Sequence, residues 1–262
     1  MAGSEKRKVD IIVEARMRST RLPGKVLLPA AGKPLLELML ERLRRIPGVT
    51  DIIIATTHDR SNQVILDLAE SMGIPVFRGD EDDVLKRVLD TARAYRTDVI
   101  VEITGDNPLI DPEISHQVIS EFLKRGDAVD YVSNDVGHHR LDWELSFPVG
   151  FSTKVFSTRK LAEVAERTHH AVDREHVVNF LVKNAERERI VNVTAQGIYR
   201  RPEIRLTLDT PEDYRVIKGV FESLYPGNPR FDARDIIEFL DANPALRDWN
   251  RHVVQQRYDY QA

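Results

Sequence analysis

The sequence predicts an α/β protein with a mostly parallel central sheet and helices on both of its faces. Short runs rich in isoleucine and valine alternate with longer amphipathic segments along the first half of the chain. The runs are almost continuously apolar, and a glycine or a polar cluster ends most segments. Strands buried on both faces have this composition, because the helices that connect parallel strands cover the sheet.

The first half of the chain predicts the order strand, helix, strand, helix, strand. The strands are expected at residues 9–13, 51–57 and 74–77, and the helices between them at 34–46 and 62–72. Each helix has one apolar face and a glycine soon after its end, as amphipathic helices commonly do.

Further elements follow from residue 84 onward. They are a helix from residue 84, a strand at 99–104, a helix at 114–124, a strand at 131–133, a helix at 158–166, an alternating strand at 204–209 and helices from 210 and at 235–240. Residues 135–140 look irregular, and an exposed loop is favoured over a metal site there because His138 and His139 lack helical spacing. The same holds for His169 and His170. The tail after Asn243 carries no motif.

Composition narrows the class of protein. The 262 residues are 42% apolar, which is ample for the core of a globular protein of one large or two small domains. The absence of cysteine excludes disulfides, thiolate catalysis and cysteine-based zinc sites. The N-terminus is too polar for a signal peptide and no apolar run reaches membrane length, so we expect a soluble cytoplasmic protein without a membrane partner.

A basic loop follows the first predicted strand. Arg16, Arg18, Arg21 and Lys25 lie within ten residues, among small hydroxyl residues and a Pro-Gly turn. Arginine and lysine suit the oxygens of a polyphosphate, although the spacing is neither that of a P-loop nor of a dinucleotide fingerprint. Solvated charge or nucleic-acid contact would explain a basic loop equally well. The formal net charge of −4 argues against nucleic acid, and ligands of parallel sheets bind at the carboxyl ends of strands, so we expect a small phosphate compound here.

Two aspartates are candidates for holding a metal ion. Asp106 comes directly after the strand at 99–104, where a carboxylate suits Mg²⁺ shared with substrate phosphates. It could instead cap the helix that begins at Pro112, but Asp111 is better placed for that cap. Thr210 suffices to cap the helix after Asp209, which leaves Asp209 available as a second ligand. Both aspartates are expected to follow strands of one sheet and to converge at one edge.

Three segments resemble the signatures of the sugar-activating cytidylyltransferases, in the order of that family. They are Arg-Met-Arg-Ser-Thr-Arg-Leu-Pro-Gly-Lys at 16–25 with Ala-Gly-Lys-Pro-Leu at 31–35, Thr-Gly-Asp-Asn-Pro-Leu-Ile-Asp-Pro at 104–112, and Leu-Asp-Thr-Pro-Glu-Asp-Tyr at 208–214. The family includes the acylneuraminate and 3-deoxy-manno-octulosonate enzymes, and this sequence is most similar to the type named after spore-coat polysaccharide biosynthesis protein F.

The resemblance implies a Rossmann-like nucleotidyltransferase fold in one domain, residues 1–262, with a subregion at 131–200 for acceptor binding and dimerisation. It implies Mg²⁺-dependent transfer of CMP from CTP to a sugar acid or similar small acceptor, for surface polysaccharide or glycoconjugate synthesis, by a homodimer. Asp106 and Asp209 would hold Mg²⁺. We expect Arg16 and Lys25 to act with them in catalysis on the phosphates, with Arg21 and Ser19 assisting.

The remaining site residues come from segments that match the family beside the nucleotide and the acceptor. Asp83 and Arg87 lie one helical turn apart as a possible ion pair, in an acidic stretch at 80–83 that also suits a helix N-terminus. Arg174 and Glu175 could equally be surface charges. We expect nucleotide contacts from Ala15 and Asp83 and acceptor contacts from a second set, Arg87, Asn107, Arg174, Glu175, His176 and Arg205.

The acceptor stretch departs from the family pattern. Val149, Ser152 and Lys154 stand where spore-coat-type relatives usually carry acidic residues, so the nucleotide half matches and the acceptor stays open. The alternatives are a glycosyltransferase that uses a nucleotide sugar, a nucleotidyltransferase for another base, a phosphorylated or phosphonate acceptor, and a nucleotide-binding scaffold without catalysis.

Overall fold

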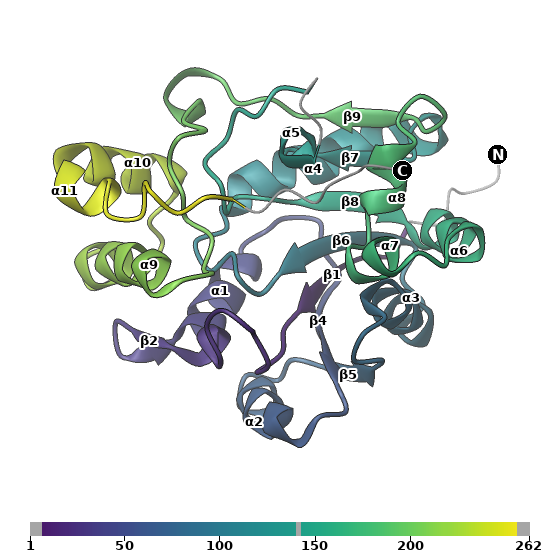
Figure 1. The fold of residues 1–262 in the computed structure, drawn as a ribbon, viewed down its shortest axis with the longest axis horizontal. Coiled ribbons are helices and arrows are strands. Elements are labelled where there is room, and N and C mark those ends of the chain that lie inside the picture. Colours follow the sequence, from purple (N-terminus) through teal and green to yellow (C-terminus); the bar gives the residue numbers. More distant parts are fainter. Residues whose placement is uncertain (1–6, 140–142, 256–262) are drawn as a thin grey trace.

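The structure, a computed structural model, describes residues 7–139 and 143–255 (Figure 1). A seven-stranded sheet in the order β5-β4-β1-β6-β8-β7-β9 runs through its middle. Its strands are β1 (Val9–Glu14), β4 (Asp51–Thr57), β5 (Val76–Gly79), β6 (Val99–Thr104), β7 (Tyr131–Ser133), β8 (Lys154–Ser157) and β9 (Ile190–Asn192). A separate antiparallel pair joins β2 (Pro29–Ala30) to β3 (Lys33–Pro34).

The sheet is mostly parallel, as predicted. β1 lies at its centre and pairs in parallel with β4 and β6, and β5 and β9 pair in parallel with β4 and β7. β8 runs antiparallel to both of its neighbours, β6 and β7. The carboxyl ends of β1, β4 and β6 therefore meet at one edge, where the polar loops that follow them converge.

Helices cover both faces of the sheet. They are α1 (Leu35–Leu43), α2 (Gln63–Ser71), α3 (Val84–Tyr95), α4 (Pro112–Arg125), α5 (Val136–His139), α6 (Thr158–Arg167), α7 (Ala171–Glu175), α8 (Asn179–Lys183), α9 (Pro211–Leu224), α10 (Ala233–Ala242) and α11 (Pro244–Arg247). Ile11 and Val13 of β1 pack with apolar residues of α1, α2 and α4, whereas Ile12 between them packs with those of α3, α6 and α8. Successive side chains of a strand point to opposite faces, which explains the continuous apolar run.

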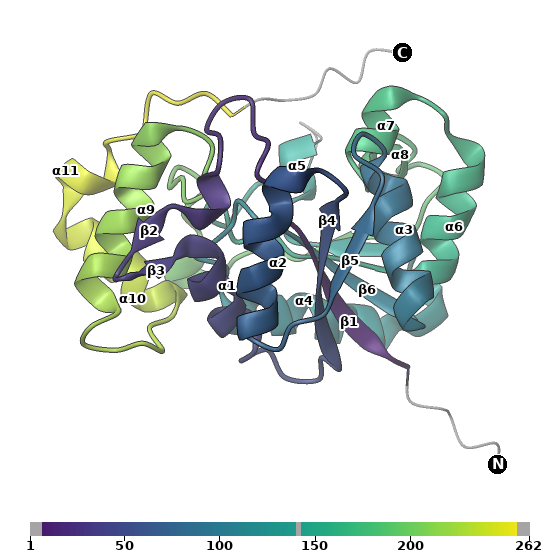
Figure 2. The same cartoon turned by 90° about the horizontal axis from the view of Figure 1, so that it is seen from below.

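A third apolar cluster lies beside the sheet rather than on it. It joins α9 and α10 to apolar residues of α1 and of the loops, and includes Phe221 against Phe231 with ring centroids 5.7 Å apart. α9, α10 and α11 gather at one end of the molecule, beside β2 and β3 (Figure 2). None of the helices within residues 7–139 and 143–255 combines the length and apolarity needed to span a bilayer.

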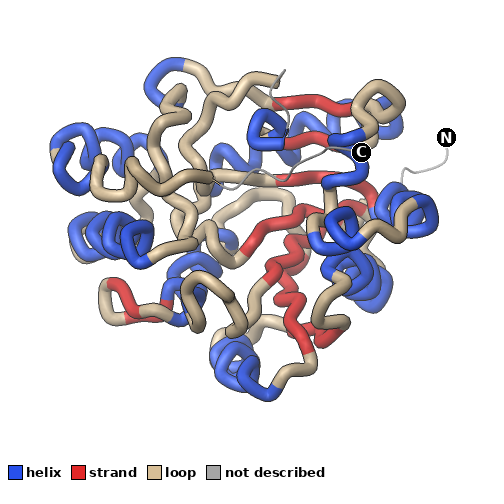
Figure 3. The backbone as a smooth tube through the Cα atoms, viewed as in Figure 1, coloured by secondary structure: helices blue, strands red, loops and turns tan. Residues whose placement is uncertain are grey.

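The prediction of a strand at 204–209 is wrong. The chain between β9 and α9 is loop apart from one short turn of helix, and Arg205 contributes an isolated bridge to Val149 (Figure 3). The segment is extended, but its N–H groups bond to other loops: Leu206 to the Val149 carbonyl at 2.6 Å and Leu208 to the Asp106 carbonyl at 2.7 Å. Gly150 allows this contact, because a Cβ on it would lie 2.6 Å from the Leu206 carbonyl carbon.

Smaller differences concern element limits. Residues 136–139, expected to be irregular, form α5; the side chains of His138 and His139, and Arg140, lie outside the described residues. The strand expected at 74–77 spans Val76–Gly79 instead. Several short elements were not predicted: β2, β3, β8, β9, α7, α8 and α11.

Candidate active site

A cleft of about 1370 Å³ opens at the carboxyl edge of β1 and β6. Its walls come from the basic loop, the start of α3, the turn after β6, the segment before α9 and the segment that leads into β8. Predicted site residues in its lining are Ala15, Arg16, Ser19, Arg21, Lys25, Arg87, Asp106, Asn107, Glu175, His176 and Asp209.

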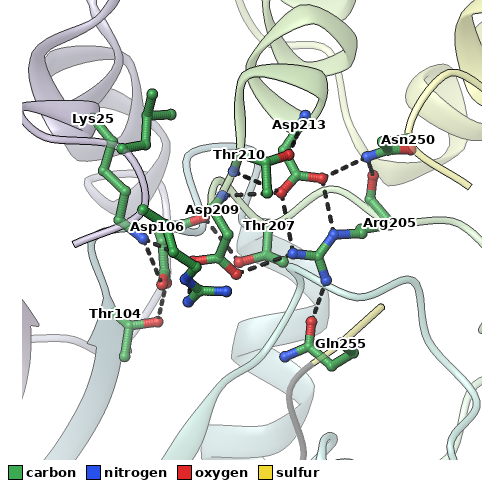
Figure 4. Close-up of polar contacts among 12 residues, drawn as sticks. Lys25, Thr104, Asp106, Arg205, Thr207, Asp209, Thr210, Asp213, Asn250 and Gln255 are labelled. Carbon is green, nitrogen blue, oxygen red and sulfur yellow. Dashed lines mark hydrogen bonds and ion pairs between the residues drawn. The ribbon is translucent and has the colours of Figure 1, made fainter. Parts of the chain in front are cut away.

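Lys25 joins the two candidate metal ligands. Its ammonium Nζ donates to Asp106 Oδ2 at 3.2 Å and to Asp209 Oδ1 at 2.9 Å (Figure 4). Although Asp106 and Asp209 are far apart in sequence, their carboxylates therefore converge on one cation. The predicted convergence of the two aspartates is confirmed, although Asp209 follows a loop rather than a strand.

The three charges stabilise one another. Burial alone would lower the pKa of Lys25, but the Asp106 and Asp209 carboxylates outweigh it and hold the pKa above its ordinary value. Burial likewise works against ionisation of Asp106, whereas Lys25 and the Thr104 hydroxyl favour it, and the net pKa of Asp106 lies below its ordinary range. Near neutral pH the site thus contains an ammonium ion and ionised carboxylate.

A tight turn places Lys25. Gly24 has φ +72°, a conformation that glycine adopts readily, and Lys25 begins a 3-10 turn, Lys25–Leu27. The Gly24 and Lys25 N–H groups bond to the Met17 and Leu22 carbonyls at 2.9 and 3.2 Å. These two amides are therefore engaged within the loop and unavailable to a ligand.

Farther along the loop, backbone amides remain unengaged. The N–H groups of residues 18–21 donate no hydrogen bond to any atom of residues 7–139 and 143–255, whereas the Met17 and Leu22 amides do bond to side chains. Arg16 turns toward the start of α3, with its Nη1 3.5 Å from the Glu81 carboxylate. Arg18 pairs with Asp59 at 2.9 Å and remains largely exposed.

The turn after β6 fixes Asp106. The Gly105 N–H bonds to the Glu14 carbonyl at 2.8 Å, and a Cβ on Gly105 would lie 2.8 Å from the same oxygen. Glycine is thus required for close packing of two strand ends rather than for the approach of a ligand. Thr104 Oγ1 donates to Asp106 Oδ1 at 2.5 Å, and Asn107 Nδ2 donates to Thr104 Oγ1 at 3.0 Å.

The predicted helix caps are confirmed, which leaves both candidate ligands facing the cleft. The Asp111 carboxylate accepts from the N–H groups of Glu113 and Ile114 at the start of α4. Thr210 caps α9 in a capping box with Asp213. Asp209, directly before that cap, has a side chain only 5% exposed.

Three predicted site residues lie outside the lining of the cleft. The Asp83 side chain caps α3 and pairs with Arg174, at 2.8 Å from Arg174 Nε, so the expected ion pair between Asp83 and Arg87 is not formed. Arg87 instead donates to the Asp80 and Glu81 carbonyls.

Arg205 is the third predicted residue outside the lining. It lies behind Asp209, to which its Nη2 donates at 3.0 Å.

The lining of the cleft also contains charges that the sequence did not single out as a site. Lys154 pairs with Glu102 at 2.9 Å, and Glu14 lies beside them. Burial, together with the nearby Glu102 carboxylate, raises the pKa of Glu14 well above its ordinary value. Glu14 and Glu102 each lie in an otherwise largely apolar strand. An acidic residue in such a strand was the sequence feature that could have marked them as part of the site.

The donor set is compatible with a divalent cation shared with a substrate. The Lys25 ammonium occupies the position between two carboxylates that such a cation would take. Within the described part of the chain, no three acidic or histidine side chains are grouped so that they could hold a metal ion by themselves. Mg²⁺ is usually bound by one or two carboxylates together with substrate phosphates, so Asp106 and Asp209 meet this requirement.

Comparison with known proteins identifies relatives of nearly the whole chain and of part of it. A family model described as cytidylyltransferase matches residues 11–238. The spore coat polysaccharide biosynthesis protein SpsF of Bacillus subtilis is 31% identical over 239 residues, which are 89% of this chain and 94% of that protein. The 3-deoxy-manno-octulosonate cytidylyltransferase of an Anaeromyxobacter species is 37% identical over 115 residues, which are 43% of this chain and 46% of that protein.

A solved structure has the same architecture. The cytidylyltransferase from Leptospira borgpetersenii serovar Hardjo-bovis superposes with a TM-score of 0.85 at 30% identity, and the match covers 96% of this chain and 99% of that one. The likeness therefore extends over nearly the whole chain.

Proposed function

Because the chain belongs to the cytidylyltransferase family, we propose that it transfers CMP from CTP to a sugar acid or a related small acceptor and releases pyrophosphate. The product would serve the synthesis of surface polysaccharide or another glycoconjugate, in line with the name of the Bacillus relative. CTP is an intracellular nucleotide, so the enzyme would work in the cytoplasm.

The contact of Lys25 with both Asp106 and Asp209 carries this proposal. An ammonium ion and two carboxylates at the carboxyl edge of a parallel sheet are suited to a nucleoside triphosphate that binds with a divalent cation. The basic loop over them adds Arg16, Arg21 and the unengaged amides of residues 18–21, which are suited to phosphate oxygens.

The reaction forms one bond and breaks another. An acceptor hydroxyl oxygen bonds to the α-phosphorus of CTP, the bond from that phosphorus to the oxygen bridging to the β-phosphate breaks, and the hydroxyl proton passes to solvent. Pyrophosphate leaves with the bonding electrons. Lys25 and Arg16 would stabilise the negative charge that grows on the phosphates, and Arg21 and Ser19 would hold the chain of phosphates in line.

Asp106 and Asp209 would hold Mg²⁺, which when bound neutralises phosphate charge. In that state the two carboxylates would no longer require Lys25 as their partner. The Lys25 ammonium would then be able to turn toward a phosphate oxygen without leaving an uncompensated charge behind.

The acceptor would occupy the part of the cleft lined by Arg87, Asn107, Glu175 and His176. Glu175 and His176 belong to residues 131–200, the subregion that we assign to acceptor binding and dimerisation. Arg174 and Asp83 would support this wall through their ion pair rather than by touching a ligand. Lys154 and Ser152 give the same wall a less acidic character than the spore-coat-type pattern.

A pyrophosphate-release screen tests the proposal. The protein would be incubated with Mg²⁺ and each of CTP, UTP, GTP and ATP, together with nonulosonic and octulosonic acids, sugar phosphates or phosphonates. The proposal expects release that requires both CTP and an acceptor. Release with another nucleotide would show that the enzyme uses a different nucleobase. Consumption of a nucleotide sugar without release of pyrophosphate would indicate a glycosyltransferase instead.

A further inference from the structure

The segment after α11 packs against the residues that lie behind Asp209. Asn250 of this segment is only 1% exposed. Its side-chain Nδ2 donates to the Asp213 carboxylate at 2.8 Å and to the Arg205 carbonyl at 3.0 Å. Asn250 lies beyond residues 11–238, so the match to the family model does not include it.

Asp213 connects Asn250 to the segment that carries Asp209. Its fully buried carboxylate accepts from the N–H groups of Asp209 and Thr210, at 3.0 and 3.1 Å, within the capping box of α9. Arg205 Nε and Nη2 also donate to it, at 2.8 and 3.1 Å. One carboxylate therefore fixes both the backbone of Asp209 and the guanidinium plane of Arg205 (Figure 4).

Arg205 in turn fixes the side chain of Asp209. Its Nη2 donates to Asp209 Oδ2 at 3.0 Å from behind the cleft. The other oxygen, Oδ1, accepts from Lys25 at 2.9 Å and from Arg21 at 2.8 Å on the cleft side. The two oxygens of one carboxylate are thus assigned to different tasks.

We propose that Asn250, Asp213 and Arg205 act as positioning residues that hold Asp209 with Oδ2 engaged behind the cleft and Oδ1 presented to a divalent cation. Arg205, which the sequence assigned to acceptor binding, is thus assigned instead to positioning Asp209. This inference rests on the proposed function, because it takes Asp209 as a ligand of the cation. Partners of ligating carboxylates typically affect metal affinity by about 10- to 100-fold.

The test uses two variants of the full-length protein and measures Mn²⁺ binding. In Arg205→Lys the charge is kept but the planar fork that contacts Asp213 and Asp209 together is lost. In Asn250→Ala the anchor of that fork is removed, and no residue of the cleft lining changes. The dissociation constant of Mn²⁺ in the presence of CTP is measured by electron paramagnetic resonance, and the melting temperature is measured in parallel.

We expect Mn²⁺ to bind about tenfold more weakly to each variant. The two effects should be less than additive in the double variant, because both act through the Asp213 carboxylate. With saturating metal, the KM for CTP should stay near that of the wild type.

Two matched controls separate positioning from a general loss of stability. Arg201 forms a two-pronged pair with Asp241 away from the cleft, and Asn243 donates to a backbone carbonyl of α10. Arg201→Lys and Asn243→Ala should leave Mn²⁺ affinity unchanged, even where they lower the melting temperature.

Unchanged Mn²⁺ affinity in Arg205→Lys and Asn250→Ala, with a wild type that binds Mn²⁺ and releases pyrophosphate, would overturn this inference alone. The same holds if the controls weaken Mn²⁺ binding as much. A wild type that neither binds Mn²⁺ nor releases pyrophosphate would overturn the proposed function as well. If Arg205→Lys fails to fold, Asn250→Ala decides.

Discussion

Lys25 balances charge at the point where the chain brings two carboxylates together. Its side chain is only 13% exposed; without it Asp106 would lose this ion pair, whereas Asp209 would keep Arg21 and Arg205 as partners. Neighbouring carboxylates raise each other's pKa, and a buried charge left unpaired is costly. The residue thus acts as a counter-ion to the two carboxylates in the structure and, on the proposed mechanism, would act as a phosphate ligand when CTP and Mg²⁺ are bound.

Replacing Lys25 by methionine removes the ammonium and keeps much of the side-chain volume. We expect kcat to fall about a hundredfold, which corresponds to about 3 kcal/mol, because a contact to developing phosphate charge is strongest in the transition state. The measurement is steady-state pyrophosphate release.

Lys33→Met is the matched control for this variant. Lys33 likewise pairs with two carboxylates, Glu37 and Glu41, but it does not line the cleft. Its loss should leave kcat within about twofold of the wild type, as for a surface charge without a role in the site. Equal losses in both variants would argue that Lys25 acts through stability alone.

At the scale of elements, apolar runs and caps made most of the α/β core predictable. β1, β4, β6 and the helices α1 to α4 follow from isoleucine, valine and leucine spacing, and the caps of α4 and α9 from Asp111 and Thr210. β8 and β9, of four and three residues, were not predicted, whereas β7, which also has three residues, was. Residues 204–209 alternate like a strand, but loops rather than the sheet receive their hydrogen bonds.

Some residues of the candidate site could likewise be predicted from the sequence, and others could not. Lys25, Asp106 and Asp209 stand in recognisable segments, and the structure brings them together. The sequence around Asn250 and Thr104 does not predict their hydrogen-bond partners. Asn250 contacts Asp213 in a distant segment, and Thr104 contacts Asp106 only because of the turn between them. The Asp83 contact was misassigned since spacing along one helix favoured Arg87, whereas Arg174 comes from another helix.

The edge of the sheet offers a pH prediction. Asp130, directly before β7, pairs with Arg189 before β9, with Oδ2 2.9 Å from Nε and Oδ1 2.8 Å from Nη2. This pair lowers the pKa of Asp130 to about 2, against the effect of burial. A lowered folded-state pKa stabilises the protein above the ordinary aspartate range, and that contribution is lost as the pH falls through about 2.

Urea unfolding of the wild type and Asp130→Asn checks this prediction. The difference in their free energies of unfolding should be largest at pH 5 and should shrink toward pH 2, because protonated Asp130 resembles asparagine. A difference that stays constant over this range would contradict the assignment of the ion pair.

At the scale of the whole molecule, segments from both ends of the chain build one cleft. The basic loop and the turn after β6 belong to the parallel half, whereas Asp209 lies just before α9 and Asn250, which supports it from behind, lies after α11. The Leu208 N–H to Asp106 carbonyl bond, at 2.7 Å, ties the two parts directly beneath the carboxylates. A change in how α9 packs against α10 and its other neighbours should therefore alter the position of Asp209 in the site.

The resemblance to the family also predicts a homodimer, with residues 131–200 at the interface. Light scattering after size-exclusion chromatography should give twice the chain mass of 30.0 kDa. Among homo-oligomers, dimers with twofold symmetry are the commonest. A mass that stays at that of one chain at micromolar concentration would show that the dimer does not form.

The most direct test compares pyrophosphate release from CTP by the wild type, Asp106→Asn and Asp209→Asn at saturating Mg²⁺ and acceptor. Each substitution keeps the shape of the side chain and removes the negative charge that would hold the cation. We predict that both variants still bind CTP in the absence of metal but release pyrophosphate about a hundredfold more slowly. Release at the wild-type rate from either variant would contradict the view that these two carboxylates and Lys25 form the site of nucleotidyl transfer.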